Sequence, residues 1–151
     1  DSYIYPMFTG PEPHQDMTED CKSTFEQARM IASISPKASA AMLRLCIDML
    51  CDHVQVETKN KKLNEKIQKL LDNGKINLSQ ANILDAVRVI GNGALHPGLI
   101  DYSDQTSVNV LFLIINDLVD GLLGTVNRIE TIKNMLSPED RDKLDNRIAK
   151  P

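Results

Sequence analysis

Residues 35–54 read SPKASAAMLRLCIDMLCDHV, and this stretch decides the fold. Ser35 followed by Pro36 is typical of a helix start, because serine caps the free amides and proline fits the first helical position. Apolar residues then recur at steps of three and four: Ala40, Leu43, Ile47, Leu50 and Val54. Met42, Leu45, Cys46 and Met49 widen this stripe until little polar surface remains. The pattern predicts a helix from Lys37 to about Val54 at the centre of the domain.

Amphipathic segments flank this helix on both sides. Their apolar spacing predicts helices that begin at Thr18, Lys62, Asn77 and Ser137, and one long helix over 105–136. In the long helix we expect these residues to face the core: Leu111, Ile115, Leu118, Leu122, Val126, Ile129 and Leu136. Phe112, Val119 and Leu123 are expected on a second apolar face. A surplus apolar face on a long helix usually meets a partner, which predicts a homodimer, with Gly121 and Gly124 allowing close approach.

These elements define a simple organisation. Residues 1–17 contain Pro6, Pro11 and Pro13, which disfavour a helix and indicate an extended N-terminal arm. Residues 18–136 are expected to form the helical bundle domain, and residues 137–151 a charged C-terminal helix. The sequence shows no pattern typical of strands. We therefore predict an all-α bundle of about five or six helices with an extended N-terminal arm.

Composition narrows the classes of function. The formal net charge of -4 argues against indiscriminate binding to nucleic acid, which depends on a basic surface. No run reaches the roughly 18 uninterrupted apolar residues of a membrane span, so no membrane partner is expected. Features of a secretory signal are missing, which favours a cytoplasmic protein. The lysine-rich segment around Lys62, Lys66 and Lys69 also carries Glu65 and Asp72, so we interpret it as a solvated helix face rather than a phosphate track.

The cysteines do not indicate a metal site. There are three of them, Cys21, Cys46 and Cys51, and only the last two lie close together, inside an apolar helical run. His14 and His53 do not complete a spacing that resembles a zinc site. We expect reduced, buried thiols, no metal and no cofactor.

A row of polar residues marks the candidate site. If the segment 85–97 is helical, Arg88, Asn92 and His96 follow one another at steps of four and share one face. Gly91 and Gly93 remove bulk beside this row, so a phosphate, a base or a second backbone could approach closely. Pro97 then ends the helix.

A second arginine could join this row from the central helix. Arg44 could form a weak pair with Asp48, four residues later, or could point into the site. We therefore count Arg44, Gly91 and Gly93 as candidate ligand-binding residues, together with Arg88, Asn92 and His96.

Four motifs in order carry a resemblance to a known family. They are Ser35 to Arg44, Leu63 to Leu71, Gly74 to Ile76, and Gly91 to His96. Together they resemble an uncharacterised bacterial and phage helical domain of the HEPN superfamily, sometimes fused to restriction-endonuclease subunits. The resemblance covers about residues 16–123. It implies a helical bundle that dimerises and acts in defence or conflict between phage and host, with RNA, a nucleotide or another defence or phage protein as partner.

Active members of that superfamily are metal-independent endoribonucleases that use an arginine and a histidine about four to six residues apart. Matching Asn92 and His96 to their motif puts Gly91 where that arginine belongs, and Arg88 is the nearest arginine. In a cleavage reaction, His96 would exchange protons, Arg88 would stabilise phosphate charge and Asn92 would orient the substrate.

Two other hypotheses stay open. The same residues could bind a nucleotide or an RNA end without cleaving it. Alternatively, Arg88 could pair with Asp85 while Asn92 and His96 satisfy helix ends, so that the domain serves only to dimerise and recruit.

Overall fold

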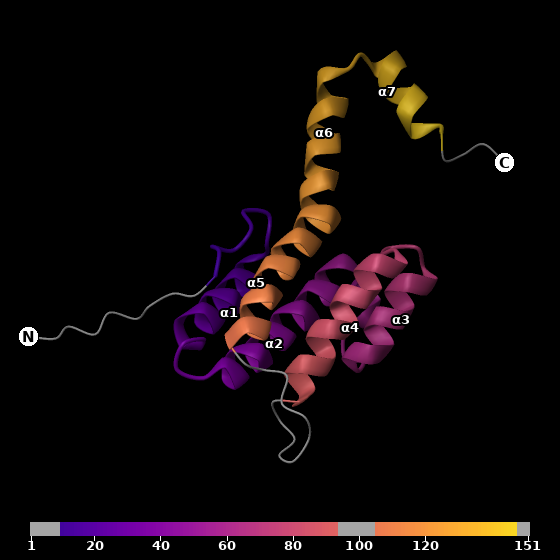
Figure 1. Ribbon diagram of the computed structural model, residues 1–151. Coiled ribbons are helices and arrows are strands. Elements are labelled where there is room, and N and C mark those ends of the chain that lie inside the picture. The colour runs from indigo at the N-terminus through magenta and orange to yellow at the C-terminus, as the bar shows by residue number, and fades with distance from the viewer. Residues whose placement is uncertain (1–9, 94–104, 148–151) are drawn as a thin grey trace, which may run out of the picture.

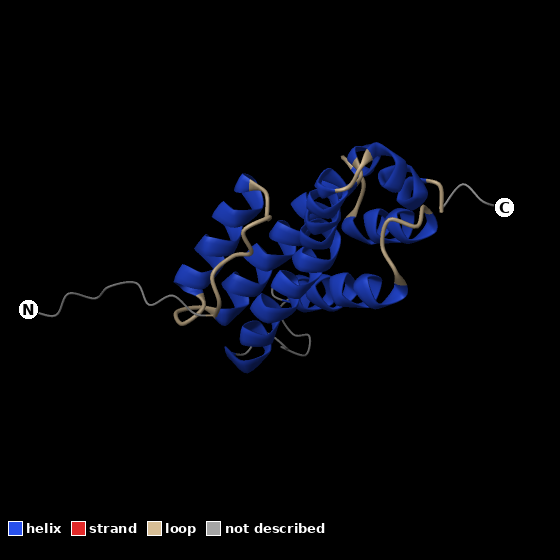
Figure 2. Cartoon of the chain, turned by 90° about the horizontal axis from the view of Figure 1, so that it is seen from above, coloured by secondary structure: helices blue, strands red, loops and turns tan. Residues whose placement is uncertain are grey.

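The computed structural model describes residues 10–93 and 105–147, and within them all regular structure is helical (Figures 1 and 2). The predicted all-α class is therefore confirmed. The helices are α1 (Glu19–Ile31), α2 (Pro36–Val54), α3 (Leu63–Asp72), α4 (Leu78–Gly93), α5 (Gln105–Val119), α6 (Thr125–Met135) and α7 (Pro138–Asp145). A 3₁₀ turn, η1 (Val56–Thr58), follows α2, and a π-helical turn, η2 (Asp120–Gly124), joins α5 to α6.

The central position of α2 is confirmed. This helix packs against α1, α3, α4 and α5, and its buried side chains include Leu43, Ile47 and Leu50. Its start is fixed as predicted, because the Ser35 side chain accepts a hydrogen bond from the amide of Ala38 at 3.1 Å. Phe25 of α1 and Phe112 of α5 meet edge to face, with ring centroids 5.3 Å apart.

The end of α3 and the start of α4 also follow from the sequence. Gly74 adopts a φ of 68°, a left-handed conformation that suits glycine and stops α3. Asn77 and Gln80 form a reciprocal cap, since the Gln80 amide donates to Asn77 Oδ1 at 2.8 Å and the Asn77 amide to Gln80 Oε1 at 2.9 Å. The chain therefore reverses between two antiparallel neighbours and brings α4 against α2.

The predicted long helix exists, but η2 interrupts its regular period. A π turn inserts about one extra residue and so rotates everything after it by about 100° around the axis. Leu111, Ile115 and Leu118 face the core as predicted, whereas Val126 is 54% exposed and Ile129 44% exposed. Conversely, Phe112 and Val119, which we expected on a second face, are buried. Leu122 still packs against the core, so the expected core face was wrong only beyond it. The reason is that α6 leaves the bundle and buries none of its side chains.

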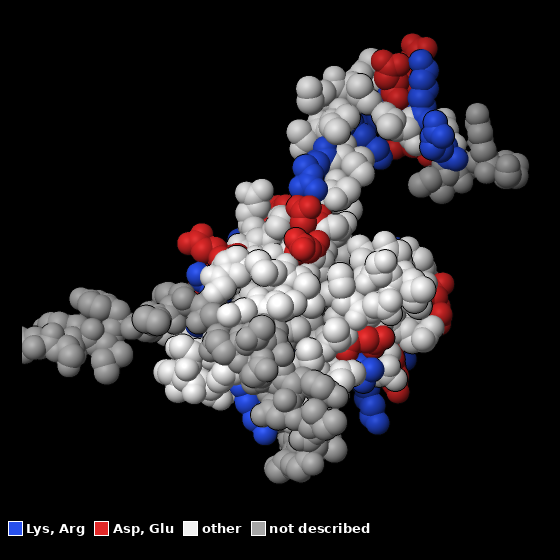
Figure 3. Space-filling view, in the orientation of Figure 1, with Lys and Arg blue, Asp and Glu red and all other residues white. Residues whose placement is uncertain are grey.

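The helix α6 projects away from the bundle, and the short helix α7 follows it after a turn (Figure 1). Lys133 of α6 pairs with Asp145 of α7, with Nζ and Oδ1 2.7 Å apart. Charged side chains of both signs gather on α6 and α7 (Figure 3). By length and composition alone, the stretch Val108–Met135 would suffice to cross a membrane; 39% of its most apolar window is buried inside the protein.

The described part of the N-terminal arm lies along α5. Asn116 holds it from both sides, because its Oδ1 accepts from the His14 amide at 2.9 Å and its Nδ2 donates to the Glu12 carbonyl at 2.8 Å. Gly10 packs so closely on Phe112 that an added Cβ would lie 3.0 Å from that ring. The arm is thus part of the packed domain from Gly10 onward.

Candidate functional site

The polar row predicted from the sequence begins on the last turns of α4. Arg88, Asn92 and Gly93 are half-buried there, and Gly91 is buried. His96 lies outside the described residues, as do Ala94 and Pro97. The structure therefore places four of the six candidate residues on one helix end and adds Arg44 from α2.

Gly91 brings α4 into tight contact with α2. A Cβ atom at Gly91 would lie 2.5 Å from Cβ of Arg44 and 3.0 Å from the carbonyl oxygen of Ala40. The space that glycine leaves is therefore filled by the neighbouring helix and is not open to a ligand. Its contribution is indirect, because it seats the stem of Arg44 against the end of α4.

Arg44 has an unusual environment for an arginine. It is half-buried, and its Nε is sealed from solvent without a hydrogen-bond acceptor. We had considered a pair with Asp48, but no such ion pair occurs among the described residues, and Asp48 instead meets Nζ of Lys66 at 2.6 Å. A buried Nε–H without an acceptor carries an unmet desolvation cost.

Arg88 does pair with Asp85. Its Nε lies 3.1 Å from Asp85 Oδ1, on adjacent turns of α4, and the two side chains are 24% and 42% exposed. A pair of this kind contributes only about 0.2–0.5 kcal/mol, because water competes for both groups. The pair between Arg88 and Asp85 is the one that the scaffold hypothesis predicted. Because the pair is weak, Arg88 can exchange Asp85 for an anion that binds it more strongly.

The sequence analysis did not predict an ion-pair network that involves α2 one to two turns after Arg44. Lys66 of α3 is 4% exposed, and its Nζ lies 2.6 Å from Asp48 Oδ1 and 2.8 Å from Asp52 Oδ1. Burial lowers the pKa of Lys66, but the hydrogen bonds with the two carboxylates outweigh it and leave that pKa raised. Asp48 and Asp52, four residues apart on α2, were the available signal, since two acids on one turn of a buried helix require a cation.

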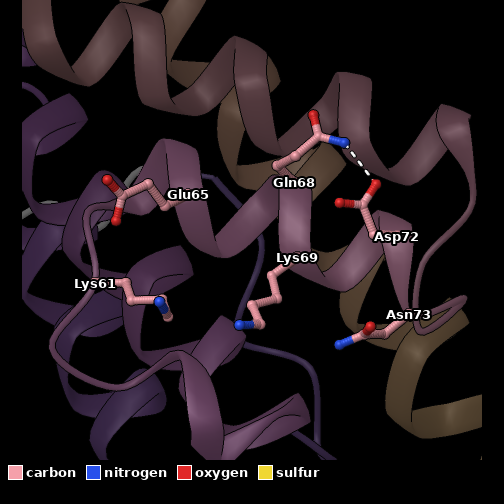
Figure 4. A pocket seen from close by; sticks show the side chains of 6 residues that line it. All are labelled: Lys61, Glu65, Gln68, Lys69, Asp72 and Asn73. Atoms are coloured by element: carbon pink, nitrogen blue, oxygen red, sulfur yellow. Dashed lines mark hydrogen bonds between the residues drawn. The ribbon is translucent and has the colours of Figure 1, made fainter.

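Lys61, before α3, and Lys69, on α3, do not belong to a phosphate track. Lys61, Glu65, Gln68, Lys69, Asp72 and Asn73 line an open depression with a volume of about 350 Å³ (Figure 4). Gln68 Nε2 donates to Asp72 Oδ1 at 2.8 Å, and acids alternate with the lysines. This arrangement agrees with the expected solvated face at Lys69, whereas the expectation was wrong for Lys66, which is buried against Asp48 and Asp52.

The other cluster that sequence reasoning missed surrounds the π turn. Asp120 Oδ1 lies 2.9 Å from His14 Nε2, and both carboxylate oxygens of Asp120 accept from Arg128, at 2.9 and 3.1 Å. Hydrogen bonds from Arg128 and then from His14 lower the pKa of Asp120 to about 2. Gly124 leaves room for this cluster, because a Cβ there would lie 2.7 Å from Asp120 Oδ1.

This second cluster is built to hold the arm. Nδ1 of His14 accepts from the Asp16 amide at 3.0 Å while Nε2 contacts Asp120, so neither ring nitrogen is free for a substrate. We had weighed His14 only as a metal ligand, and its partner is 106 residues away, beyond the reach of a spacing argument. Gly124, which we expected to face another helix, serves this contact within the chain.

The cysteines behave as buried thiols. Cys21 and Cys46 contact each other's backbone across α1 and α2, each Sγ lying 3.6 Å from the other residue's carbonyl oxygen. All three cysteines are free and buried. Burial raises the pKa of Cys51 to about 12. Across residues 10–93 and 105–147, no group of His, Cys, Asp and Glu side chains is arranged to hold a metal ion.

Comparison with known proteins gives a family but no activity. The family model described as "Domain of unknown function (DUF4145)" matches residues 26–146. No curated protein matches the chain, and neither does any solved structure. The matched range contains α2, α4 and every candidate site residue from Arg44 to His96. The chain therefore belongs to the DUF4145 family.

Proposed function

We propose that this domain binds a phosphate-bearing ligand, RNA or a nucleotide, at the carboxyl end of α4. The observation that carries the proposal is Arg44, whose Nε is sealed without an acceptor and which makes no ion pair among the described residues. A phosphate is the acceptor that best fits a guanidinium, because two of its oxygens can accept from the planar fork together.

Arg88 supplies a second positive charge to the same ligand. It lies one turn before Gly91, which contacts the stem of Arg44. Its exposed pair with Asp85 is weak enough to be replaced by a phosphate. Asn92, half-exposed on the next turn, can orient a base or ribose through its amide.

Metal-independent RNA cleavage is the catalytic form of this proposal, and it follows the resemblance to the HEPN superfamily. His96 would take the proton of the ribose 2′-hydroxyl as that oxygen attacks phosphorus. Protonated His96 then donates that proton to the 5′-oxygen as the P–O5′ bond breaks, and a 2′,3′-cyclic phosphate remains. The arginines would stabilise the charge on the phosphate oxygens, so the reaction needs no metal. Such an enzyme would act as a cytoplasmic homodimer in defence or conflict between phage and host.

The alternative is a module that only dimerises and recruits another protein. The pair between Arg88 and Asp85 favours it, as does the role of Gly91 in packing. In that case Arg44 would contact the recruited protein.

One experiment separates these functions. Labelled RNA and a panel of nucleotides are incubated in EDTA with the wild type, Arg44→Met, His96→Ala and Arg147→Met. Arg147 is an exposed arginine after α7, so its variant controls for the loss of one positive charge. Cleavage that disappears in His96→Ala and weakens in Arg44→Met identifies an endoribonuclease. Binding without cleavage that disappears only in Arg44→Met identifies a binding module. If the wild type shows no binding and no cleavage, the proposal is overturned.

A further inference from the structure

One exposed apolar surface runs along both α5 and α6, and we call it the outer face. It consists of Val110 and Leu113 on α5 and of Val126, Ile129 and Ile132 on α6. Val110, Leu113, Val126 and Ile132 are each 50–55% exposed, which is unusual for four aliphatic side chains on one rod. On α5 this surface lies opposite the buried side chains Leu111, Ile115 and Leu118.

The π turn makes these two halves a single surface. At about 100° per residue, with one extra residue in η2, Leu113 and Ile132 fall at nearly the same angle around the rod. In a regular helix Ile132 would lie about 100° away, nearer the side of the core. The interruption at Asp120–Gly124 therefore aligns exposed apolar residues over the whole length from Val110 to Ile132.

The outer face carries a carboxylate for which the described residues provide no ion-pair partner. Asp117 is exposed in the middle of the face, four residues after Leu113, and forms no ion pair within the described part of the chain. Whatever covers the outer face must offer a cation there. Arg128 lies at the edge of the same face on α6, and its side chain is 59% exposed. It already pairs with Asp120, but a guanidinium has five N–H donors, so it can also donate to a second carboxylate.

We propose that a second copy of this chain covers the outer face, running antiparallel, with the twofold axis beside Leu122 and Leu123. Leu113 and Ile132 are then equally distant from the axis. Leu113 of one copy therefore packs against Ile132 of the other. Asp117 and Arg128 are also equally distant, so the unpaired carboxylate meets a guanidinium. This inference rests on the homodimer included in the proposed function and specifies which surface makes it.

The chemistry of the outer face favours this occupant over others. A parallel pair would set Asp117 against Asp117 within an apolar seam, where like charges repel. The antiparallel pair instead places Arg128 of one copy beside Asp117 of the other, so that this carboxylate gains a cation.

The size of the outer face suits a weak interface. Half-exposed aliphatic side chains can each bury roughly 50 Å², so the five of them give about 500 Å² over two copies. With an apolar share of about 60%, the whole interface reaches about 800 Å², a size typical of weak, reversible association.

Cysteine cross-linking tests the orientation directly, because the three native cysteines are buried. We compare Leu113→Cys, Ile132→Cys, the double variant with both changes, and a control with Leu113→Cys and Asn127→Cys. Asn127 is exposed on the opposite side of α6. Leu113 and Ile132 of one chain are about 29 Å apart at 1.5 Å per residue, too far for a short bismaleimide. The expected result is a covalent dimer from the double variant only.

Each other result overturns the inference in a distinct way. Covalent dimers from the single variants would indicate a parallel pair. A mass of twice 16.9 kDa by light scattering without cross-linking would place the dimer interface elsewhere. A monomeric mass would exclude the dimer, and vesicle binding lost in Ile132→Glu would then identify a lipid surface as the occupant. RNA or nucleotide binding that depends on Arg44 is measured separately, so either proposal can fail alone.

Discussion

Gly91 and Arg44 stand so close across the contact of α2 and α4 that an added Cβ on Gly91 would lie 2.5 Å from Cβ of Arg44. The carbonyl oxygen of Ala40, 3.0 Å from the same point, belongs to the backbone and cannot turn aside. This contact both locks the central pair of helices and fixes the base of the candidate anion site.

Gly91→Ala should therefore destabilise the domain by about 1–3 kcal/mol, the usual cost of overpacking, despite the higher helix propensity of alanine. Urea unfolding at fixed protein concentration measures this change. Gly121→Ala is the matched control, because its new Cβ would meet only the flexible end of Gln80, at 3.2 Å. Equal stability of the two variants would contradict the tight contact.

Lys66→Met should destabilise the protein by about 2–4 kcal/mol, because it leaves the carboxylates of Asp48 and Asp52 half-buried without their cation. Lys69→Met, on the exposed side of the same helix, should change the free energy of unfolding by less than about 0.5 kcal/mol. Chemical denaturation of both variants gives the comparison. A small effect of Lys66→Met would mean that water replaces the lysine without cost.

The ion pairs of Asp120 with Arg128 and His14 predict that the free energy of unfolding depends on pH in the acidic range. Its folded pKa is about 2, below the ordinary 3.8, so its contribution is fully present above pH 4 and is lost as the pH falls toward 2. The difference in free energy of unfolding between wild type and Asp120→Asn should be constant above pH 4 and narrow below it. A difference that grows on acidification would contradict these pairs.

His14→Ala should release the arm without unfolding the bundle. The histidine connects the Asp16 amide to Asp120, whereas the helices beneath keep their own core. Amide hydrogen exchange should accelerate several-fold at Asp16 and Met17 and stay unchanged in α2. Uniform acceleration across the domain would show that the arm is needed for global stability.

Local signals in the sequence predicted the helices well. The cap at Ser35, the box of Asn77 and Gln80, and the stop at Gly74 each depend on neighbouring residues only, and each is found in the structure. The π turn could not be predicted in this way, because Asp120 and Gly124 contact His14, which lies 106 residues before Asp120 in the sequence. The candidate site was predicted in part. Its residues on α4 follow from spacing, but the environment of Arg44 depends on packing between two helices.

Arg44→Met gives the sharpest test of whether this arginine serves function or structure. Methionine keeps the stem that packs on Gly91 and removes the buried Nε, so the domain should keep or gain stability, by up to about 1–2 kcal/mol. Arg29→Met is the contrasting case, because Arg29 pairs with Glu26 at 2.9 Å and donates to the Gly10 carbonyl, and its loss should destabilise. If Arg44 binds phosphate, its variant loses ligand while its unfolding midpoint holds or rises. A variant that loses stability and ligand together would instead assign Arg44 to the packing of α2 on α4.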